Sequence, residues 1–92
     1  MASVLLRIGR SVTDWPEFYA SALALQAQGV SVYHAYLNQA NVWQGQRRGL
    51  SVLCWTVDDG DDIARMLSLG VDSINSNLPE RVRRMVDERR LS

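Results

Sequence analysis

Three short apolar runs, each introduced by a glycine, recur along the chain at nearly equal intervals. They begin at Gly29, Gly49 and Gly70, which are 20 and 21 residues apart, so the sequence contains an internal repeat. A glycine just after a helix accepts the left-handed conformation that ends the helix, and a β-branched run after it is typical of a short buried strand. Each run therefore predicts a helix end followed by a strand. The predicted strands cover residues 3–8, 30–36, 50–57 and 71–75.

Helical periodicity fills the intervals between the predicted strands. In each interval, apolar residues recur on one face of the predicted helix. The pattern is clearest at residues 61–69, where Asp61 and Asp62 in the first turn favour the helix dipole. Asp14 is an acidic cap for the first helix, and Pro79 suits the first turn of the last one because its missing N–H would be unpaired there. Gly45 lowers the helix propensity of the second helix. The predicted helices cover residues 14–28, 39–48, 61–69 and a last segment that begins at residue 79.

The order strand then helix, repeated four times, predicts an α/β fold with parallel strands. The repeat leaves loops of only a few residues, which suits a (β/α) barrel of the TIM type. A complete barrel needs about 200 residues or more, so we expect residues 1–92 to form a single partial domain, about half of a barrel. A flat, open four-stranded sheet is the competing architecture, because periodicity does not separate the two.

Composition excludes several classes of function. Ten arginines balance ten acidic residues, so the net charge of zero leaves no excess of positive charge for nucleic acid. One cysteine and one histidine make neither an internal disulfide nor a cysteine-based zinc site. No apolar run approaches the roughly 20 residues of a membrane span. No secretory signal is apparent, so the default expectation for the compartment is the cytoplasm.

Two neighbouring segments carry the most informative motif. Residues 49–58 are a glycine-led apolar strand that ends in Trp-Thr-Val-Asp, and residues 70–79 read Gly-Val-Asp-Ser-Ile-Asn-Ser-Asn-Leu-Pro. Together they resemble the C-terminal signature of the glycerophosphodiester phosphodiesterase family, in which a strand ending in Trp-Thr-Val-Asn precedes a helix and Gly-Val-Asp-Gly-Ile. The departures are mild: Asp58 stands for asparagine, Ser73 for glycine and Ser76 for threonine. The likeness covers nearly the whole chain as the second half of that family's barrel.

The resemblance implies a phosphoric diester hydrolase of lipid metabolism. The family hydrolyses a glycerophosphodiester to glycerol 3-phosphate and an alcohol, using a divalent metal, Mg²⁺ or Ca²⁺, and two histidines that serve as acid and base. Those histidines and the metal-binding acidic residues belong to the first half of the family's barrel, and no position of this chain matches them. We therefore expect no catalytic residue and no metal ligand in this chain, and no activity from the 92 residues alone.

Trp55 is the one pocket residue that the resemblance assigns, since in the family it lines the substrate pocket at the C-terminal mouth of the barrel. The strand pattern agrees with this placement, because Trp55 lies near the end of its strand, where barrels build their sites. Burial as an ordinary core residue is the alternative. Alternation predicts one face with Ser51, Leu53, Trp55 and Val57 and an opposite face with Val52, Cys54 and Thr56.

Three polar residues complete the predicted substrate-binding set. His34, on the face of Val30 and Val32, is a candidate base or ligand, or a hydrogen-bonded structural residue. Ser76 and Asn77 follow the last strand, where barrels often bind phosphate, so they either donate to a phosphodiester or cap the last helix.

The acidic cluster at residues 58–62 does not have the spacing of a calcium loop. It predicts a capped helix start instead, with carboxylates that favour the helix dipole and repel phosphate.

A second class of function stays open beside the enzyme. The first and last strands of a half barrel each expose an unpaired edge, and such edges pair with other chains. The chain is then a non-catalytic half barrel that self-associates or binds a partner. A small open-sheet binder of phosphate or nucleotides is disfavoured, because the sequence has no glycine-rich phosphate loop.

Overall fold

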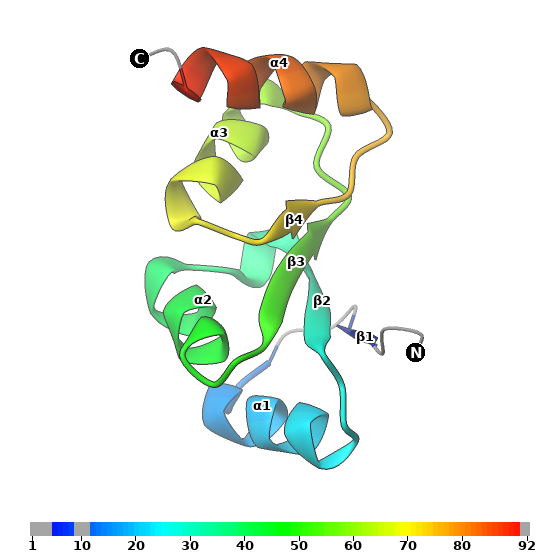
Figure 1. Ribbon diagram of the computed structural model, residues 1–92, viewed down its shortest axis with the longest axis vertical. Coiled ribbons are helices and arrows are strands. Elements are labelled where there is room, and N and C mark those ends of the chain that lie inside the picture. Colours follow the sequence, from blue (N-terminus) through cyan, green and yellow to red (C-terminus); the bar gives the residue numbers. More distant parts are fainter. Residues whose placement is uncertain (1–4, 9–11, 91–92) are drawn as a thin grey trace.

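Strands and helices alternate through the whole described part of the chain. The computed structural model describes the backbone of residues 5–8 and all of residues 12–90 (Figure 1). The elements, in chain order, are β1 (Leu5–Ile8), α1 (Trp15–Ala24), β2 (Gly29–Tyr33), the 3₁₀ turn η1 (His34–Tyr36), α2 (Gln39–Gln46), β3 (Ser51–Trp55), α3 (Gly60–Leu69), β4 (Ser73–Ile74) and α4 (Pro79–Arg90). No helix in this described part is long and apolar enough to cross a membrane.

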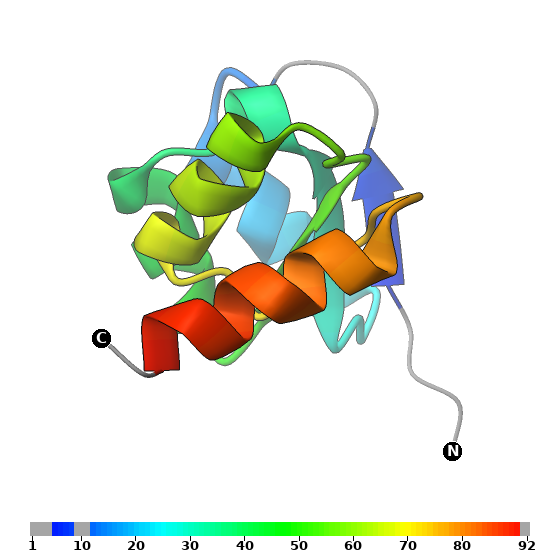
Figure 2. The same cartoon turned by 90° about the horizontal axis from the view of Figure 1, so that it is seen from above.

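The four strands form one parallel sheet in the order β1-β2-β3-β4. Figure 2 shows β1 at one edge of the sheet, far from α2 and α3. The buried residues of β2 and β3 share one cluster with residues of α1, α2 and α3, so the three helices that connect the strands lie on the same side of the sheet. A parallel sheet with all its crossovers on one side is part of a barrel, whereas an open doubly wound sheet carries helices on both faces. The predicted α/β fold and partial barrel are confirmed.

The core lies between the sheet and its helices. Alternating residues of β2 and β3 are fully buried there, and residues of α1, α2 and α3 and of the connecting segments complete the cluster. Burying this apolar surface is the main source of stability for so small a domain. The fully buried side chains include Tyr19, Val30, Val32, Val42, Val52, Cys54, Ile63 and Met66.

Gly45 lets α2 approach the sheet closely. A Cβ atom at this position would lie 2.8 Å from Cγ2 of Val52 and 2.9 Å from Cε1 of Tyr19. The Tyr19 hydroxyl donates a 2.6 Å hydrogen bond to the carbonyl of Asn41, also in α2. The residue that weakens the predicted helix is therefore the residue that allows α1, α2 and β3 to pack together.

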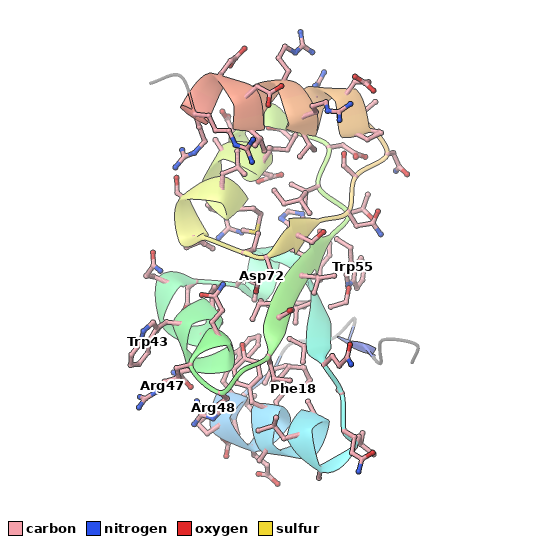
Figure 3. All side chains as sticks on the ribbon, in the orientation of Figure 1. Phe18, Trp43, Arg47, Arg48, Trp55 and Asp72 are labelled. Atoms are coloured by element: carbon pink, nitrogen blue, oxygen red, sulfur yellow. The ribbon has the colours of Figure 1, made fainter. Side chains whose placement is uncertain are left out.

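A polar network holds the amino-terminal edge of the sheet. Oδ2 of Asp72 accepts hydrogen bonds from the backbone N–H of Val52 at 2.7 Å and from Nε2 of Gln46 at 3.2 Å. Nε2 of Gln46 also donates to the carbonyl of Gly70 at 2.7 Å. Asp72 therefore ties β3, α2 and the start of β4 together, on the side of β3 where α2 lies (Figure 3).

Several predicted boundaries are wrong. The first helix ends at Ala24 because Gln26 takes a left-handed φ of 60°, and the N–H of Ala27 then bonds to the carbonyl of Ala22 at 2.9 Å. Gln26 thus takes the role predicted for Gly29, which is to end the helix in a left-handed conformation. Gly29 instead begins β2. The role is confirmed for Gly49 and Gly70, whose φ angles are 84° and 74°.

The predicted strands are also longer than the observed ones. β3 spans Ser51–Trp55, so the alternation predicted through Val57 stops at Trp55: Thr56 is exposed and Val57 is fully buried. β4 keeps two residues, Ser73–Ile74. The predicted strand at residues 3–8 is observed as Leu5–Ile8, and its first two residues lie outside the described part.

Candidate functional site

Two aromatic residues end neighbouring strands at the carboxyl edge of the sheet. Tyr33 ends β2, Trp55 ends β3, and the two are register partners. Their ring centroids are 5.4 Å apart at an interplanar angle of 58°, and both side chains are half-buried. Figure 3 shows Trp55 on the side of β3 away from α2, as its alternation with the buried Val52 and Cys54 predicts. Trp55 therefore lies at the mouth of the half barrel and outside the buried core cluster.

The aromatic surface continues beyond Tyr33. The ring of Tyr36 lies 5.5 Å from that of Tyr33 and the ring of His34 lies 4.7 Å from it. Aromatic rings at such distances attract one another and present both apolar faces and polar edges. Together, the rings of Tyr33, His34, Tyr36 and Trp55 form an aromatic cluster at the carboxyl edge.

His34 does not lie on the strand face predicted for it. β2 ends at Tyr33, where its partner β3 also ends, and His34 begins the η1 turn. Side chains rather than a strand satisfy the carbonyls of this turn: Nη2 of Arg65 donates to His34 at 2.7 Å, and Nδ2 of Asn41 donates to Tyr36 at 2.9 Å. Nδ1 of His34 is buried without a hydrogen-bond partner among the described residues. The turn thus places His34 within the aromatic cluster.

Ser76 and Asn77 meet Asp58 across the mouth. Oδ1 of Asp58 accepts hydrogen bonds from the Ser76 hydroxyl and from the Asn77 N–H, both at 2.8 Å, and Oδ2 accepts one from Nδ2 of Asn77 at 3.3 Å. Nη1 of Arg81 donates to the Asp58 carbonyl at 3.0 Å. These hydrogen bonds, led by that from Ser76, hold the pKa of the Asp58 carboxyl below its usual 3.8. The carboxylate is therefore ionised and fully engaged in joining the two loops.

The acidic cluster divides into two parts. Asp59 caps α3, where its Oδ1 accepts from the N–H of Asp61 at 2.8 Å, and Asp61 and Asp62 lie in the first turn. The predicted capped helix start is confirmed for these three residues. Asp58 lies before the cap and serves the loop network, a role that the sequence analysis missed. The signal was available, since Asp58 stands where the family signature has asparagine, a residue whose single side-chain oxygen can also accept hydrogen bonds from a neighbouring loop.

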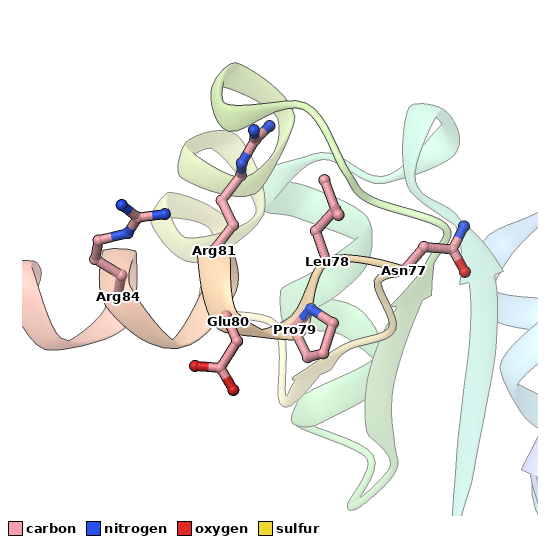
Figure 4. A pocket seen from close by; sticks show the side chains of 6 residues that line it. All are labelled: Asn77, Leu78, Pro79, Glu80, Arg81 and Arg84. Carbon is pink, nitrogen blue, oxygen red and sulfur yellow. The ribbon is translucent and has the colours of Figure 1, made fainter.

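An open pocket of about 350 Å³ lies at the start of α4. It is lined by Asn77, Leu78, Pro79, Glu80, Arg81 and Arg84. Figure 4 shows Arg81 and Arg84 pointing from one side of the helix while Glu80 points from the other. One wall of the pocket therefore offers guanidinium groups, which are hydrogen-bond donors suited to phosphate.

The described residues do not form a metal centre. No group of three or more histidine, cysteine or acidic side chains comes together in this part of the chain. The Asp58 carboxylate is already bonded to three donors. Burial raises the pKa of the Cys54 thiol to about 12, so the free thiol stays protonated at neutral pH.

Comparison with known proteins decides the family. The model of the glycerophosphoryl diester phosphodiesterase family matches residues 4–81. The chain belongs to this family. It is 38% identical over 64 residues to the glycerophosphodiester phosphodiesterase GDPD4 of Arabidopsis thaliana, a match that covers 70% of this chain and 20% of that protein. The recognised family is confirmed, and the chain spans about a fifth of the length of this plant relative.

Solved structures share the fold. A protein of Agrobacterium tumefaciens described as a glycerophosphoryl diester phosphodiesterase superposes with a TM-score of 0.89 at 22% identity, over 98% of this chain and 38% of that one. A phosphodiesterase of Oleispira antarctica, in complex with the product sn-glycerol-3-phosphate, superposes with a TM-score of 0.79 at 18% identity, over 92% of this chain and 33% of that one. The chain thus matches about a third of each structure.

Proposed function

We propose that this chain forms the carboxyl-terminal half of a glycerophosphodiester phosphodiesterase barrel. The completed barrel hydrolyses a glycerophosphodiester to glycerol 3-phosphate and an alcohol. The observation that carries this proposal is the Tyr33–Trp55 pair at the carboxyl edge of a sheet face that no described helix covers, because barrel enzymes build their sites at that edge. Family membership and the glycerol-phosphate complex of the Oleispira antarctica structure support the reaction class.

In this proposal the chain's own residues bind and orient the substrate. Trp55 and Tyr33 supply an aromatic wall that excludes water from one side of the pocket. His34 adds a polar ring edge to that wall. Ser76 and Asn77 lie on the neighbouring loop, where Asn77 lines the pocket at the start of α4. Their direct donation to the phosphodiester stays a prediction.

The chemistry itself needs groups from the other half. Acid–base hydrolysis of the kind implied by the family uses two histidines, and this sequence has one. We propose that the Mg²⁺ or Ca²⁺ ion is held by residues outside the described part, since the described residues do not fit a metal. The 92-residue chain alone is therefore expected to be inactive.

The first test is turnover of glycerophosphocholine by the purified chain with Mg²⁺ or Ca²⁺. The expected result is no turnover above a metal-free blank, while circular dichroism verifies that the chain is folded. Turnover by the folded chain would overturn the proposed inactivity.

The second test completes the barrel. The amino-terminal half of the Agrobacterium tumefaciens structure, which shares the fold at a TM-score of 0.89, is fused in front of this chain. We expect turnover, and Trp55→Ala lowers kcat/KM by about tenfold, equivalent to about 1.4 kcal/mol. Trp43→Ala is the matched control, because Trp43 is 55% exposed on α2. A folded fusion without turnover would contradict the proposed function.

Self-association through the open sheet edges is the second candidate. β1 and β4 are the outer strands of the described sheet, so one edge of each strand is unpaired within it. Sedimentation velocity over a range of concentrations tests it, because the candidate predicts a dimer whose fraction rises with concentration. A compact monomer at every concentration would exclude it.

A further inference from the structure

Asp58 joins two loops that lie far apart in the sequence. It follows β3 by three positions, and its carboxylate bonds to Ser76 and Asn77, which precede α4. Its backbone carbonyl accepts from Arg81 in the first turn of α4. One residue after β3 thus contacts three residues that lie between β4 and the first turn of α4.

The network also determines where α4 begins. The Ser76 oxygen that donates its proton to Asp58 accepts the N–H of Leu78 at 2.9 Å. Leu78 immediately precedes Pro79, the first residue of α4. A continuous path of hydrogen bonds therefore runs from Asp58 through Ser76 to the helix start. Without the carboxylate, the hydroxyl of Ser76 loses its acceptor and keeps only the bond that it accepts from Leu78.

Helix capping does not account for Asp58. The cap of α3 is Asp59, whose side chain bonds to the N–H of Asp61. Asp58 is half-buried while Asp59 is exposed, and its partners belong to the opposite loop. The two adjacent aspartates therefore have separate tasks and provide a matched pair for experiment.

We propose that Asp58 is a positioning residue of the barrel mouth, which holds Asn77 and Arg81 against the pocket at the start of α4. Asp58 does not line this pocket, whereas Asn77 and Arg81 do. It therefore acts through these two residues on the binding of a phosphate-containing ligand. This part of the inference rests on the proposed function.

The test measures amide hydrogen exchange by NMR in the 92-residue chain. In Asp58→Ala, the Asn77 amide loses its carboxylate acceptor, and we expect its exchange to accelerate by about tenfold. Asp58→Asn keeps a side-chain oxygen as acceptor and restores most of the protection. The control Asp59→Ala accelerates exchange at Asp61 and leaves Asn77 unchanged. Unchanged exchange at Asn77 in Asp58→Ala, or failure of Asp58→Asn to restore it, would overturn the proposal.

A second measurement separates this proposal from the proposed function. sn-Glycerol 3-phosphate is titrated into the wild-type chain and the Asp58 variants while the amide shifts of residues 77, 78 and 80–84 are followed. We expect affinity to fall several-fold in Asp58→Ala and to recover in Asp58→Asn. Equal affinity in Asp58→Ala and wild type would overturn the role in binding. No binding by the wild-type chain would count against the proposed substrate class, while the exchange result still decides whether Asp58 holds the loop.

Discussion

The two faces of the sheet differ sharply in what covers them. On the helix side, Val30, Val32, Val52 and Cys54 are fully buried against α1, α2 and α3. On the other side, Tyr33, Leu53 and Trp55 are only half-buried, although they alternate with the first set along the same two strands. One sheet thus has a finished core on one face and a half-covered apolar surface on the other. This difference teaches that the helix side supplies most of the buried apolar core of the described part, while the other face keeps its apolar side chains partly exposed.

The largest expected effect compares two tyrosines. Tyr19 is fully buried on the helix side, so Tyr19→Ala should lower the free energy of unfolding by about 3–5 kcal/mol. Tyr33 lies half-buried at the mouth, and Tyr33→Ala should cost about 1 kcal/mol. Urea denaturation measures both. If Tyr19→Ala does not fold, Tyr19→Phe removes only the bond to Asn41 and should still cost about 1–3 kcal/mol. Equal losses at the two tyrosines would mean that the second face is also covered in solution.

A glycine pair sharpens the comparison. The added methyl group of Gly45→Ala meets Val52 and Tyr19 at under 3 Å, so overpacking should cost about 1–3 kcal/mol despite the better helix propensity of alanine. At Gly60 an added Cβ meets nothing within 4 Å, and Gly60→Ala should change stability by less than about 0.5 kcal/mol. Thermal unfolding distinguishes the two, and a neutral Gly45→Ala would contradict the close approach of α2 to the sheet.

The stabilisation that Asp58 provides at the carboxyl edge depends on pH, whereas the burial of apolar side chains does not. The pKa of Asp58 is lowered below 3.8 by Ser76, Asn77 and the nearby Arg81, so the unfolded chain takes up the proton first. The stabilisation by this carboxylate is present above its unfolded pKa and is lost as pH falls from about 5 through 3.8 and below. The Asp58→Asn variant lacks this stabilisation by an ionised carboxylate, so its melting temperature should approach that of the wild type as pH falls. A constant gap between the two would contradict the assignment.

The smallest expected effect lies on the outer surface of α2. The guanidinium of Arg47 lies 4.6 Å from the ring centre of the exposed Trp43. Arg47→Ala should therefore cost about 0.5 kcal/mol, and Arg47→Lys less. Urea denaturation at two salt concentrations measures the loss. A cost well above 1 kcal/mol would show that Trp43 is covered in solution by a contact that the isolated chain does not show.

The placement of Trp55 was predictable and that of His34 was not. Alternation along β3 places Trp55 on the face opposite to that of Val52 and Cys54. Val52 and Cys54 are fully buried, as this pattern predicts. Alternation fails at His34 because β2 ends where its neighbour ends, and Arg65 in α3 then stabilises the turn that follows. A strand length depends on its partners, which a local pattern does not contain. The predicted first helix is too long for a similar reason, since Gln26 takes a left-handed conformation that is expected of glycine and the helix ends before it.

The sequence by itself determined the order of elements, the parallel sheet, the family and the face of Trp55, because these follow from periodicity and from motifs within a few residues of one another. Only the tertiary structure decided the tasks of Gly45, Asp58 and Asp72. Each acts on atoms supplied by another element, through a close approach at Gly45 and through hydrogen bonds at the two aspartates. The physical reason is the same in all three cases: a contact between elements depends on distances that exist only after the helices have packed on the sheet.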